Sequence, residues 1–234
     1  MTARVLVVCT ANVCRSPMAE GLLRHHLATI GADVAVTSAG TRGPGHPPLS
    51  VDRHAVTALA EFGVEIAGHQ PRRLTRELID GAGADLIITM TRGHLRDVAT
   101  TVRTAFARTF TLRELARRAG TARRSLPTGL GAADVSELSG WVLGLGFGRR
   151  PADLLGDEPS DDIADPYGLS LADVRLTATD LDRLTRSVAA MAPWPRLARL
   201  ESAPDAARDG SPDTALDVPP HRPPDATRAP TGDS

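Results

Sequence analysis

The sequence is poor in cysteine, in aromatic residues and in long apolar runs, and it contains no lysine. Of its 234 residues only two are cysteine, and aromatic residues make up 3%. So few cysteines exclude a disulfide framework, and in a reducing compartment both are expected to be thiols. No group of cysteines and histidines has the spacing of a zinc site. The sequence therefore predicts neither a metal nor another cofactor.

An excess of one charge is also absent. The 27 basic residues are all arginine, and 28 acidic residues leave a formal net charge of −1. No global basic field would therefore attract nucleic acid or an anionic membrane. The first apolar stretch ends after Val8, too early for a signal peptide or a membrane span. We expect a cytoplasmic protein with no nucleic-acid or membrane partner.

Alternating strand and helix patterns predict an α/β fold. Continuous apolar runs typical of buried parallel strands occur at residues 5–8, 34–36 and 86–88, and a further short strand is expected near residues 110–112. Helical periodicity follows each run, at residues 17–30, 51–62, from about 93, at 113–119 and finally at 174–191. Because helices that alternate with strands favour parallel pairing, we expect a three-layer open sheet of about four parallel strands with helices on both faces.

The same pattern predicts one domain over residues 1–192. Within it, residues 120–162 combine Arg-rich, Gly-rich and acidic pieces and are interpreted as an irregular insertion. From Pro193 the composition shifts to Pro, Asp, Ala and Arg with few large apolar residues. Such a segment buries too little surface to offset its ordering entropy, so residues 193–234 are predicted to be a disordered tail.

The most informative segment connects the first strand to the first helix. Five residues separate Cys9 from Arg15, and Pro17 follows in the first helical turn. A loop of this length can direct its backbone N–H groups at one anion, and the helix N-terminus adds positive potential that favours the thiolate form of Cys9. Arg15 can bind two phosphoryl oxygens with its planar guanidinium. The predicted phosphate-binding loop continues from Cys9 through Thr10, Ala11, Asn12, Val13, Cys14, Arg15 and Ser16.

Cys9 has a simpler interpretation, because buried free cysteines often just fill the end of a strand. Ser16 likewise has two possible roles, since its hydroxyl can cap the helix or donate to the Cys9 thiolate. The reactive interpretation is preferred because the loop follows the carboxyl end of a strand, where open α/β sheets bind ligands. The histidines of the predicted helices, His94 among them, are expected to be solvated or packed.

The loop and several later motifs resemble those of the low-molecular-weight protein tyrosine phosphatases. The loop is followed by Pro17, Met18, Ala19 and Glu20 as in that family's signature. Further matches come in family order: Thr37-Ser38-Ala39-Gly40-Thr41, Gly68-His69, Met90 and Asp165-Pro166-Tyr167-Gly168. The resemblance spans about residues 4–191, apart from the insertion.

This resemblance implies an enzyme that hydrolyses phosphotyrosine monoesters through a phosphocysteine. Cys9 would attack phosphorus, Arg15 would bind the phosphoryl group, and Asp165 would protonate the leaving phenolate, with Asp161 and Asp162 as the next candidates for this acid. The substrate would be a phosphotyrosine-containing protein or a small aryl phosphate.

The resemblance also implies roles for residues around these three. A supporting hydrogen-bond network would comprise Asn12, Ser16, Ser38 and His69. Cys14 would be a redox partner that can form a disulfide with the nucleophile. The wall facing the substrate ring would include His46 and Tyr167.

Departures from the family pattern concern the loop and the end of the third strand. Ala11 stands where Gly is usual, which requires a negative φ, and Thr91 replaces the usual Asp. Two alternatives share the fold. Protein arginine phosphatases carry Thr where Val13 stands, so an aryl phosphate is preferred here. Arsenate reductases coupled to thioredoxin use additional cysteines, which this chain lacks, although an external thiol could replace them.

Overall fold

A computed structural model describes residues 2–43, 45, 49–81, 83–122, 137–154 and 159–196. Its sheet has four strands, β1 (Ala3–Cys9), β2 (Val34–Gly40), β3 (Leu86–Thr89) and β4 (Thr109–Thr111). They are paired in the order β2-β1-β3-β4, and every pair is parallel. The expected sheet of four parallel strands is thus confirmed. Because β1 lies between β2 and β3, the loop after Cys9 leaves the middle of the sheet.

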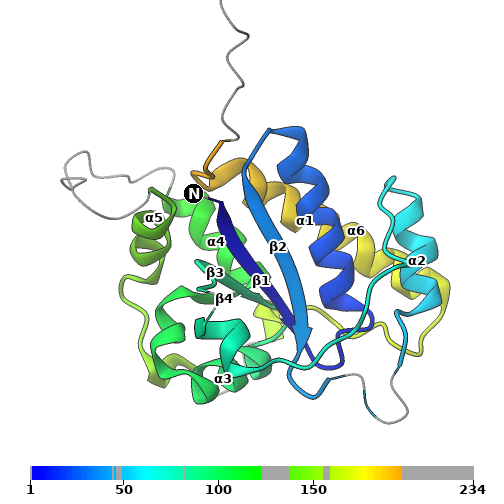
Figure 1. Ribbon diagram of the computed structural model, residues 1–234, viewed down its shortest axis with the longest axis horizontal. Helices are drawn as coiled ribbons and strands as arrows, with labels where there is room; N and C mark the ends of the chain where they lie inside the picture. The colour runs from blue at the N-terminus through cyan, green and yellow to red at the C-terminus, as the bar shows by residue number, and fades with distance from the viewer. Residues whose placement is uncertain are drawn as a thin grey trace, which may run out of the picture. The chain divides into compact units, whose positions relative to one another are not determined.

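Six α-helices are described: α1 (Arg15–Thr29), α2 (Arg53–Ala60), α3 (Arg92–Thr101), α4 (Leu112–Ala122), α5 (Glu137–Gly146) and α6 (Leu171–Met191). Shorter helical segments are η1 (Glu77–Gly81), η2 (Arg103–Arg108), η3 (Pro151–Leu154) and η4 (Pro159–Asp161). Figure 1 shows α1 and α6 side by side on one side of the sheet, and α3 on the other side of β1 and β2 in this view. Among the described helices, none is both long and apolar enough to cross a membrane.

The alternation of side chains along β1 separates two cores. Val5, Val7 and Cys9 point into the larger one, which also includes buried residues of α1, α2, α4, α5 and α6. Leu6 and Val8 point into the smaller one, which they share with residues of η1, α3 and η2. Successive strand residues face opposite sides of a sheet, so these two cores are the contacts between three layers. The expected three-layer architecture is confirmed.

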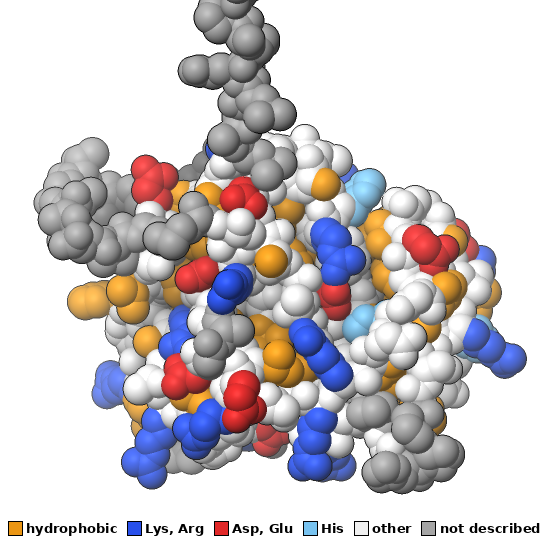
Figure 2. All heavy atoms as spheres, viewed as in Figure 1, with side chains coloured by type: hydrophobic (Ala, Val, Ile, Leu, Met, Phe, Trp, Pro, Cys, Tyr) orange, Lys and Arg blue, Asp and Glu red, His pale blue; other side chains and the backbone are white. Residues whose placement is uncertain are grey.

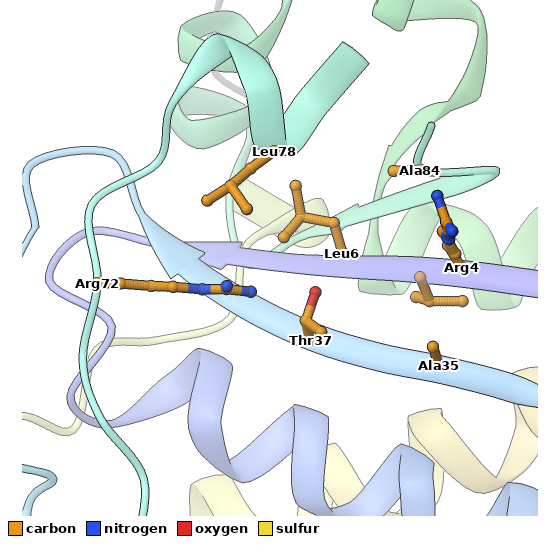
Figure 3. A pocket seen from close by; sticks show the side chains of 8 residues that line it. Arg4, Leu6, Ala35, Thr37, Arg72, Leu78 and Ala84 are labelled. Carbon is orange, nitrogen blue, oxygen red and sulfur yellow. The ribbon is translucent and has the colours of Figure 1, made fainter. Parts of the chain in front are cut away.

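A hollow of about 240 Å³ borders β1 and β2 beside the smaller core. The residues that line it include Leu6 and Thr37 of these strands together with Leu78 and Arg72 (Figure 3). No residue of the loop that follows β1 lines this hollow. On the surface seen in Figure 2, arginine side chains are interspersed with acidic and apolar ones, so this face shows no continuous basic field.

The segment expected to be an irregular insertion, residues 120–162, is partly helical. α4 continues to Ala122, and α5 buries Leu138, Val142 and Leu145 in the larger core. These three positions recur at helical spacing, but the glycines between them obscure the pattern because glycine is a poor helix former. The Arg149 guanidinium lies 4.2 Å from the centre of the Phe110 ring and donates to Thr109 O, which joins this segment to β4. Residues 123–136 and 155–158 lie outside the described part.

The boundary expected after residue 192 is a few residues too early. Trp194 is 7% exposed, and its indole Nε1–H donates to Ala189 O at 3.0 Å. Asp33 N donates to Pro195 O at 2.7 Å, and Arg196 forms a bridge with Ala32. Composition alone concealed this contact, because one tryptophan among prolines is enough to pack against a helix end. The rest of the predicted tail, residues 197–234, is not among the described residues.

Candidate active site

The loop between β1 and α1 turns around Asn12. Asn12 has φ = 62°, the one positive φ among the described non-glycine residues, and asparagine tolerates this left-handed conformation better than most residues. Ala11 therefore keeps the negative φ that its side chain requires. The turn points Asn12 N at Cys9 Sγ, at 3.3 Å. The loop thus folds back on the sulfur that ends β1.

A buried hydrogen-bond chain ends at the same sulfur. Ser38 Oγ donates to the Glu20 carboxylate at 2.5 Å, because a carboxylate only accepts. Asn12 Nδ2 donates to Ser38 Oγ at 2.7 Å and to Ser16 Oγ at 2.9 Å. The Ser16 hydroxyl proton is then left for Cys9 Sγ, 2.9 Å away. Two donors, the Ser16 hydroxyl and the Asn12 N–H, thus point at Cys9 Sγ.

His69 and Arg72 hold the other end of the Asn12 side chain. Asn12 Oδ1 accepts from Arg72 N at 2.9 Å and from His69 Nε2 at 3.2 Å. Burial lowers the pKa of His69, although the Glu20 charge opposes this shift, so the ring is neutral near pH 7 with Nε2–H as the donor. Asn12, Ser16, Ser38 and His69, which sequence reasoning grouped together, therefore form one network. Glu20 and Arg72 were missed as members, although Glu20 belongs to the motif after the loop.

Glycine at the end of β2 lets the loop pack against this strand. A Cβ atom on Gly40 would lie 2.5 Å from Thr10 O and 2.9 Å from Asn12 N, closer than real Cβ contacts allow. The next residues, Thr41 and Arg42, donate their N–H groups to Cys9 O and Thr10 O, both at 2.9 Å. The Ser-Ala-Gly motif thus has a structural explanation, because it combines a network hydroxyl with a strand end that lacks a side chain.

Arg15 connects the loop to the segment before α6. Its side chain is 6% exposed, and Nη1 donates to Ile163 O at 3.1 Å while Nη2 lies 2.6 Å from Asp165 Oδ2. The Asp165 side chain is 49% exposed, so its carboxylate is accessible to a bound molecule. Residues distant in sequence, Cys9, Arg15 and Asp165, are therefore brought to one end of the sheet.

The two neighbouring acids have other partners. Asp161 is 4% exposed and accepts from Arg117 Nη1 at 2.5 Å. Asp162 accepts from Arg92 N at 2.8 Å, at the start of α3. Ile163 N donates to Met90 O at 2.8 Å and continues this attachment. Asp161 and Asp162 thus attach the segment to α4 and α3, whereas Asp165 faces Arg15.

Cys14, the N-cap residue of α1, is 2% exposed. Burial, assisted by the charges of Asp52 and Asp165, raises the pKa of its thiol far above the usual range. Both cysteines are free, and Cys14 is a thiol. The N-cap residue Cys14 makes no side-chain capping bond, and the Ser16 hydroxyl lies 2.9 Å from Cys9 Sγ, the contact preferred for it from the sequence.

His94, which was expected to be solvated or packed, is packed and also contacts the loop. It is 6% exposed. Its Nε2 lies 2.9 Å from Thr10 Oγ1, and its Nδ1 lies 2.9 Å from Thr91 Oγ1. No motif signalled this contact, because it depends on the adjacency of β1 and β3.

In the predicted substrate wall, Tyr167 is 49% exposed and its N–H donates to Asp165 Oδ1 at 3.2 Å. His46 lies outside the described residues, and Val13 is buried in the larger core.

Known phosphatases match the chain in sequence. A family model described as low molecular weight phosphotyrosine protein phosphatase matches residues 4–132. The probable low molecular weight protein-tyrosine-phosphatase EpsP of Ralstonia solanacearum is 39% identical over 99 residues, which are 42% of this chain and 62% of that protein. The protein-arginine-phosphatase of Bacillus subtilis (strain 168) is 37% identical over 110 residues, 47% of this chain and 70% of that protein.

The fold has close counterparts as well. The crystal structure of a low molecular weight protein tyrosine phosphatase from T. tengcongensis superimposes with a TM-score of 0.56 at 28% identity, over 80% of this chain and 97% of that one. The sequence match to EpsP spans less than two thirds of that relative's length, whereas the family model matches more than half of the 234 residues here. The chain therefore belongs to the low molecular weight phosphotyrosine protein phosphatase family.

Proposed function

We propose that the protein is a protein tyrosine phosphatase that hydrolyses phosphotyrosine monoesters through a phosphocysteine intermediate. The observation that carries this proposal is the convergence on Cys9 Sγ of the Ser16 hydroxyl at 2.9 Å and the Asn12 N–H at 3.3 Å, in the same loop as Arg15. A thiolate held by two donors and placed beside a guanidinium suits attack on a phosphoryl group. Arg15 and the loop N–H groups would bind the equatorial phosphoryl oxygens and the charge that develops on them.

In the first step, Cys9 Sγ forms a bond to phosphorus while the bond from phosphorus to the phenolic oxygen breaks. Asp165 gives its proton to that oxygen, so tyrosine leaves as the neutral phenol. A dianionic phosphoryl group bound in the loop competes with Asp165 for the Arg15 guanidinium, which frees the Asp165 carboxyl for the leaving oxygen. The position of Asp165 Oδ2, 2.6 Å from Arg15 Nη2, supports this role because it lies beside the group that would bind phosphate.

In the second step, water attacks phosphorus and the sulfur–phosphorus bond breaks. Asp165, now a carboxylate, takes a proton from the water, and inorganic phosphate leaves with the Cys9 thiolate restored. One carboxyl group can serve both steps because the departing phenol and the entering water occupy the same side of phosphorus. Asp161 and Asp162 are less suited to this role, because their carboxylates already bind Arg117 and Arg92 N.

A protein arginine phosphatase is the second candidate, because a relative of that name is 37% identical over 110 residues. Val13 argues for the aryl ester, since it offers no hydroxyl to a polar guanidinium. Arsenate reduction is less supported, because both cysteines of the chain lie in or beside one loop.

The proposal extends to a cytoplasmic location and to phosphotyrosine-containing proteins or small aryl phosphates as substrates. It also includes a substrate wall that contains Tyr167, and reversible oxidation of Cys9 by disulfide formation with Cys14.

The proposal is tested by assaying the protein in parallel on phosphotyrosine, phosphoarginine and phosphoserine peptides and on arsenate with a thiol reductant. We expect kcat/KM to be highest for phosphotyrosine. Cys9→Ser should abolish turnover and still bind phosphate, because a hydroxyl is a much weaker nucleophile at neutral pH. A preference for phosphoarginine would replace the proposed substrate, and turnover by Cys9→Ser would remove Cys9 from the mechanism.

The acid role of Asp165 makes a separate prediction. Asp165→Asn should slow phosphotyrosine hydrolysis by roughly 10²–10⁴-fold, because the phenolate then leaves without a proton. Activated aryl phosphates with a low leaving-group pKa should be affected much less. Kinetics across a series of aryl phosphates measures this dependence. Asp162→Asn is the matched control, since it retains an acceptor for Arg92 N and should keep the wild-type dependence. Equal losses of Asp165→Asn on all substrates would exclude the assignment.

A further inference from the structure

His94, in the first turn of α3, contacts the loop but has no part in the proposed reaction. Its ring lies between two hydroxyls, with Nδ1 2.9 Å from Thr91 Oγ1 and Nε2 2.9 Å from Thr10 Oγ1. Thr10 follows β1 and Thr91 follows β3, and these strands are neighbours. Thr91 also caps α3, because its Oγ1 accepts from His94 N at 3.3 Å. The imidazole therefore bridges the loop and a helix start of the adjacent strand.

The imidazole is neutral. Burial, together with the positive charges of Arg15 and Arg42, lowers the pKa of His94 to about 3. A neutral imidazole has one donor nitrogen and one acceptor nitrogen. If the Thr91 hydroxyl donates to Nδ1, then Nε2–H donates to Thr10 Oγ1. Arg15 Nη2 donates to the same oxygen at 3.4 Å. Both lone pairs of Thr10 Oγ1 are then occupied, and its own proton remains for an anion in the loop.

We propose that His94 is a positioning residue of the active site, which through Thr10 holds the Arg15 guanidinium in the orientation that binds the phosphoryl group. This inference rests on the proposed function in so far as Arg15 binds phosphate there. Arg15 has two other fixed contacts, Ile163 O through Nη1 and Asp165 through Nη2. Thr10 is the contact that comes from the loop itself, so its hydroxyl fixes the orientation of the guanidinium relative to the loop N–H groups. His94 in turn fixes the orientation of the Thr10 hydroxyl.

Two substitutions of His94 separate its two hydrogen bonds. The side-chain amide of glutamine reaches roughly as far as Nε2 and can still donate to Thr10. The shorter amide of asparagine matches Nδ1 and reaches Thr91 only. His94→Gln should therefore retain most of the phosphate affinity, whereas His94→Asn should weaken it by about 10-fold, the usual effect of losing one hydrogen bond that supports a charged group. Thr10→Val should weaken phosphate binding similarly, and Thr10→Ser, which keeps the hydroxyl, should restore it.

The experiment measures binding of inorganic phosphate by calorimetry, with KM and kcat on phosphotyrosine and on an activated aryl phosphate in parallel. We expect His94→Asn to raise the phosphate Kd and KM together and to leave the dependence on leaving-group pKa unchanged, because the acid Asp165 is intact. In the Thr10→Val background, His94→Asn should add little, because the two residues act through one bond.

Val98→Ala is the matched control for lost stability, because Val98 is a buried residue of the same helix in the smaller core. It should lower the melting temperature without changing the phosphate Kd. Equal phosphate affinity of His94→Asn and His94→Gln, additive effects with Thr10→Val, or the same loss in Val98→Ala would each overturn the proposal. Should His94→Asn not fold, the Thr10→Val and Thr10→Ser pair decides, and equal affinities there would also overturn it. Because phosphate binding needs no turnover, a wild type inactive on phosphotyrosine would contradict the proposed function alone.

Discussion

Two hydrogen-bond chains support the loop between β1 and α1, one from β2 and one from β3. The chain on the β2 side runs from Glu20 through Ser38, Asn12 and Ser16 to Cys9, and all of these residues are buried. The chain on the β3 side runs from Thr91 through His94 and Thr10 to Arg15. A buried carboxylate directs the first, and a neutral imidazole directs the second. The two chains thus serve different groups, since the first ends at Cys9, the proposed nucleophile, and the second at Arg15, the residue proposed to bind the phosphoryl group.

One loop is thus held by a chain that contains a buried charge and by a chain of mostly neutral groups, and substitutions in the two chains should have different effects. Removing the Ser38 hydroxyl from the β2 chain leaves the buried Glu20 carboxylate with one hydrogen bond fewer, which is expensive in folding free energy. Removing a link from the β3 chain leaves only neutral groups and the already paired Arg15. We therefore expect the β2 chain to determine both stability and reactivity, and the β3 chain to determine mainly phosphate affinity.

The largest effect is expected from a substitution that breaks the contact of the loop with β2. Gly40→Ala places a Cβ 2.5 Å from Thr10 O, so the loop must move away from β2 and both chains are disturbed. Since displacement of reacting groups by about 1 Å lowers rates by about 10²-fold, kcat/KM on an aryl phosphate should fall by at least that factor. Gly68→Ala is the control, because nothing lies within 4 Å of its added Cβ. Wild-type kinetics for Gly40→Ala would show that the loop tolerates the displacement.

A smaller effect is expected from cutting the β2 chain alone. Ser38→Ala leaves the Glu20 carboxylate and Asn12 Nδ2 each without one partner, which should lower the free energy of unfolding by about 1–3 kcal/mol. Urea denaturation measures this loss. Because the Ser16 proton is then less firmly directed at Cys9, kcat should fall for good and poor leaving groups alike. A loss confined to phosphate affinity would mean that the two chains do not differ as described.

The β3 chain predicts a pH dependence of stability. The pKa of His94 in the folded protein, about 3, lies below the unfolded value near 6.5. As the pH falls below 6.5, the unfolded state takes up this proton first, so stability present above pH 6.5 is lost progressively toward pH 3. The contribution approaches about 1.4 kcal/mol per pH unit. Urea denaturation at several pH values in this window gives the free energy of unfolding of wild type and of His94→Gln. This free energy should fall less steeply with decreasing pH in the variant, and equal slopes in the two proteins would contradict a neutral, buried His94.

His26 and His69 act in the same direction, because burial lowers the pKa of each. They are present in wild type and in His94→Gln, so the difference between the two proteins isolates His94.

The smallest effect on activity is expected from a site remote from both chains. Trp194→Ala removes an indole that is 7% exposed and bonded to Ala189 O. It should lower the free energy of unfolding by about 3–5 kcal/mol, the usual range for buried aromatic residues. The kinetic constants, measured well below the melting temperature, should stay at wild-type values. A large fall in kcat would show that lost stability alone reproduces the effects assigned to the two chains.

Much of the site was predictable because it is local in sequence. Cys9, Asn12, Arg15 and Ser16 lie within eight residues between a strand and a helix, where backbone geometry limits the possible arrangements. Motif order then added Ser38, His69 and Asp165. The helix α5 was not predicted because its glycines obscure the apolar spacing, and Trp194 was assigned to the tail because composition averages over a single buried side chain.

The sequence by itself determined the alternation of strands and helices, the parallel sheet and the chemistry of the loop, because hydrophobic periodicity and short-range backbone geometry are local properties. Only the tertiary structure decided which distant side chains reach that loop. Glu20 joins through a helix face, Arg72 through a backbone N–H and His94 through the adjacency of β1 and β3. These contacts depend on strand order and register, which arise when the two cores pack, and no spacing along the chain encodes them.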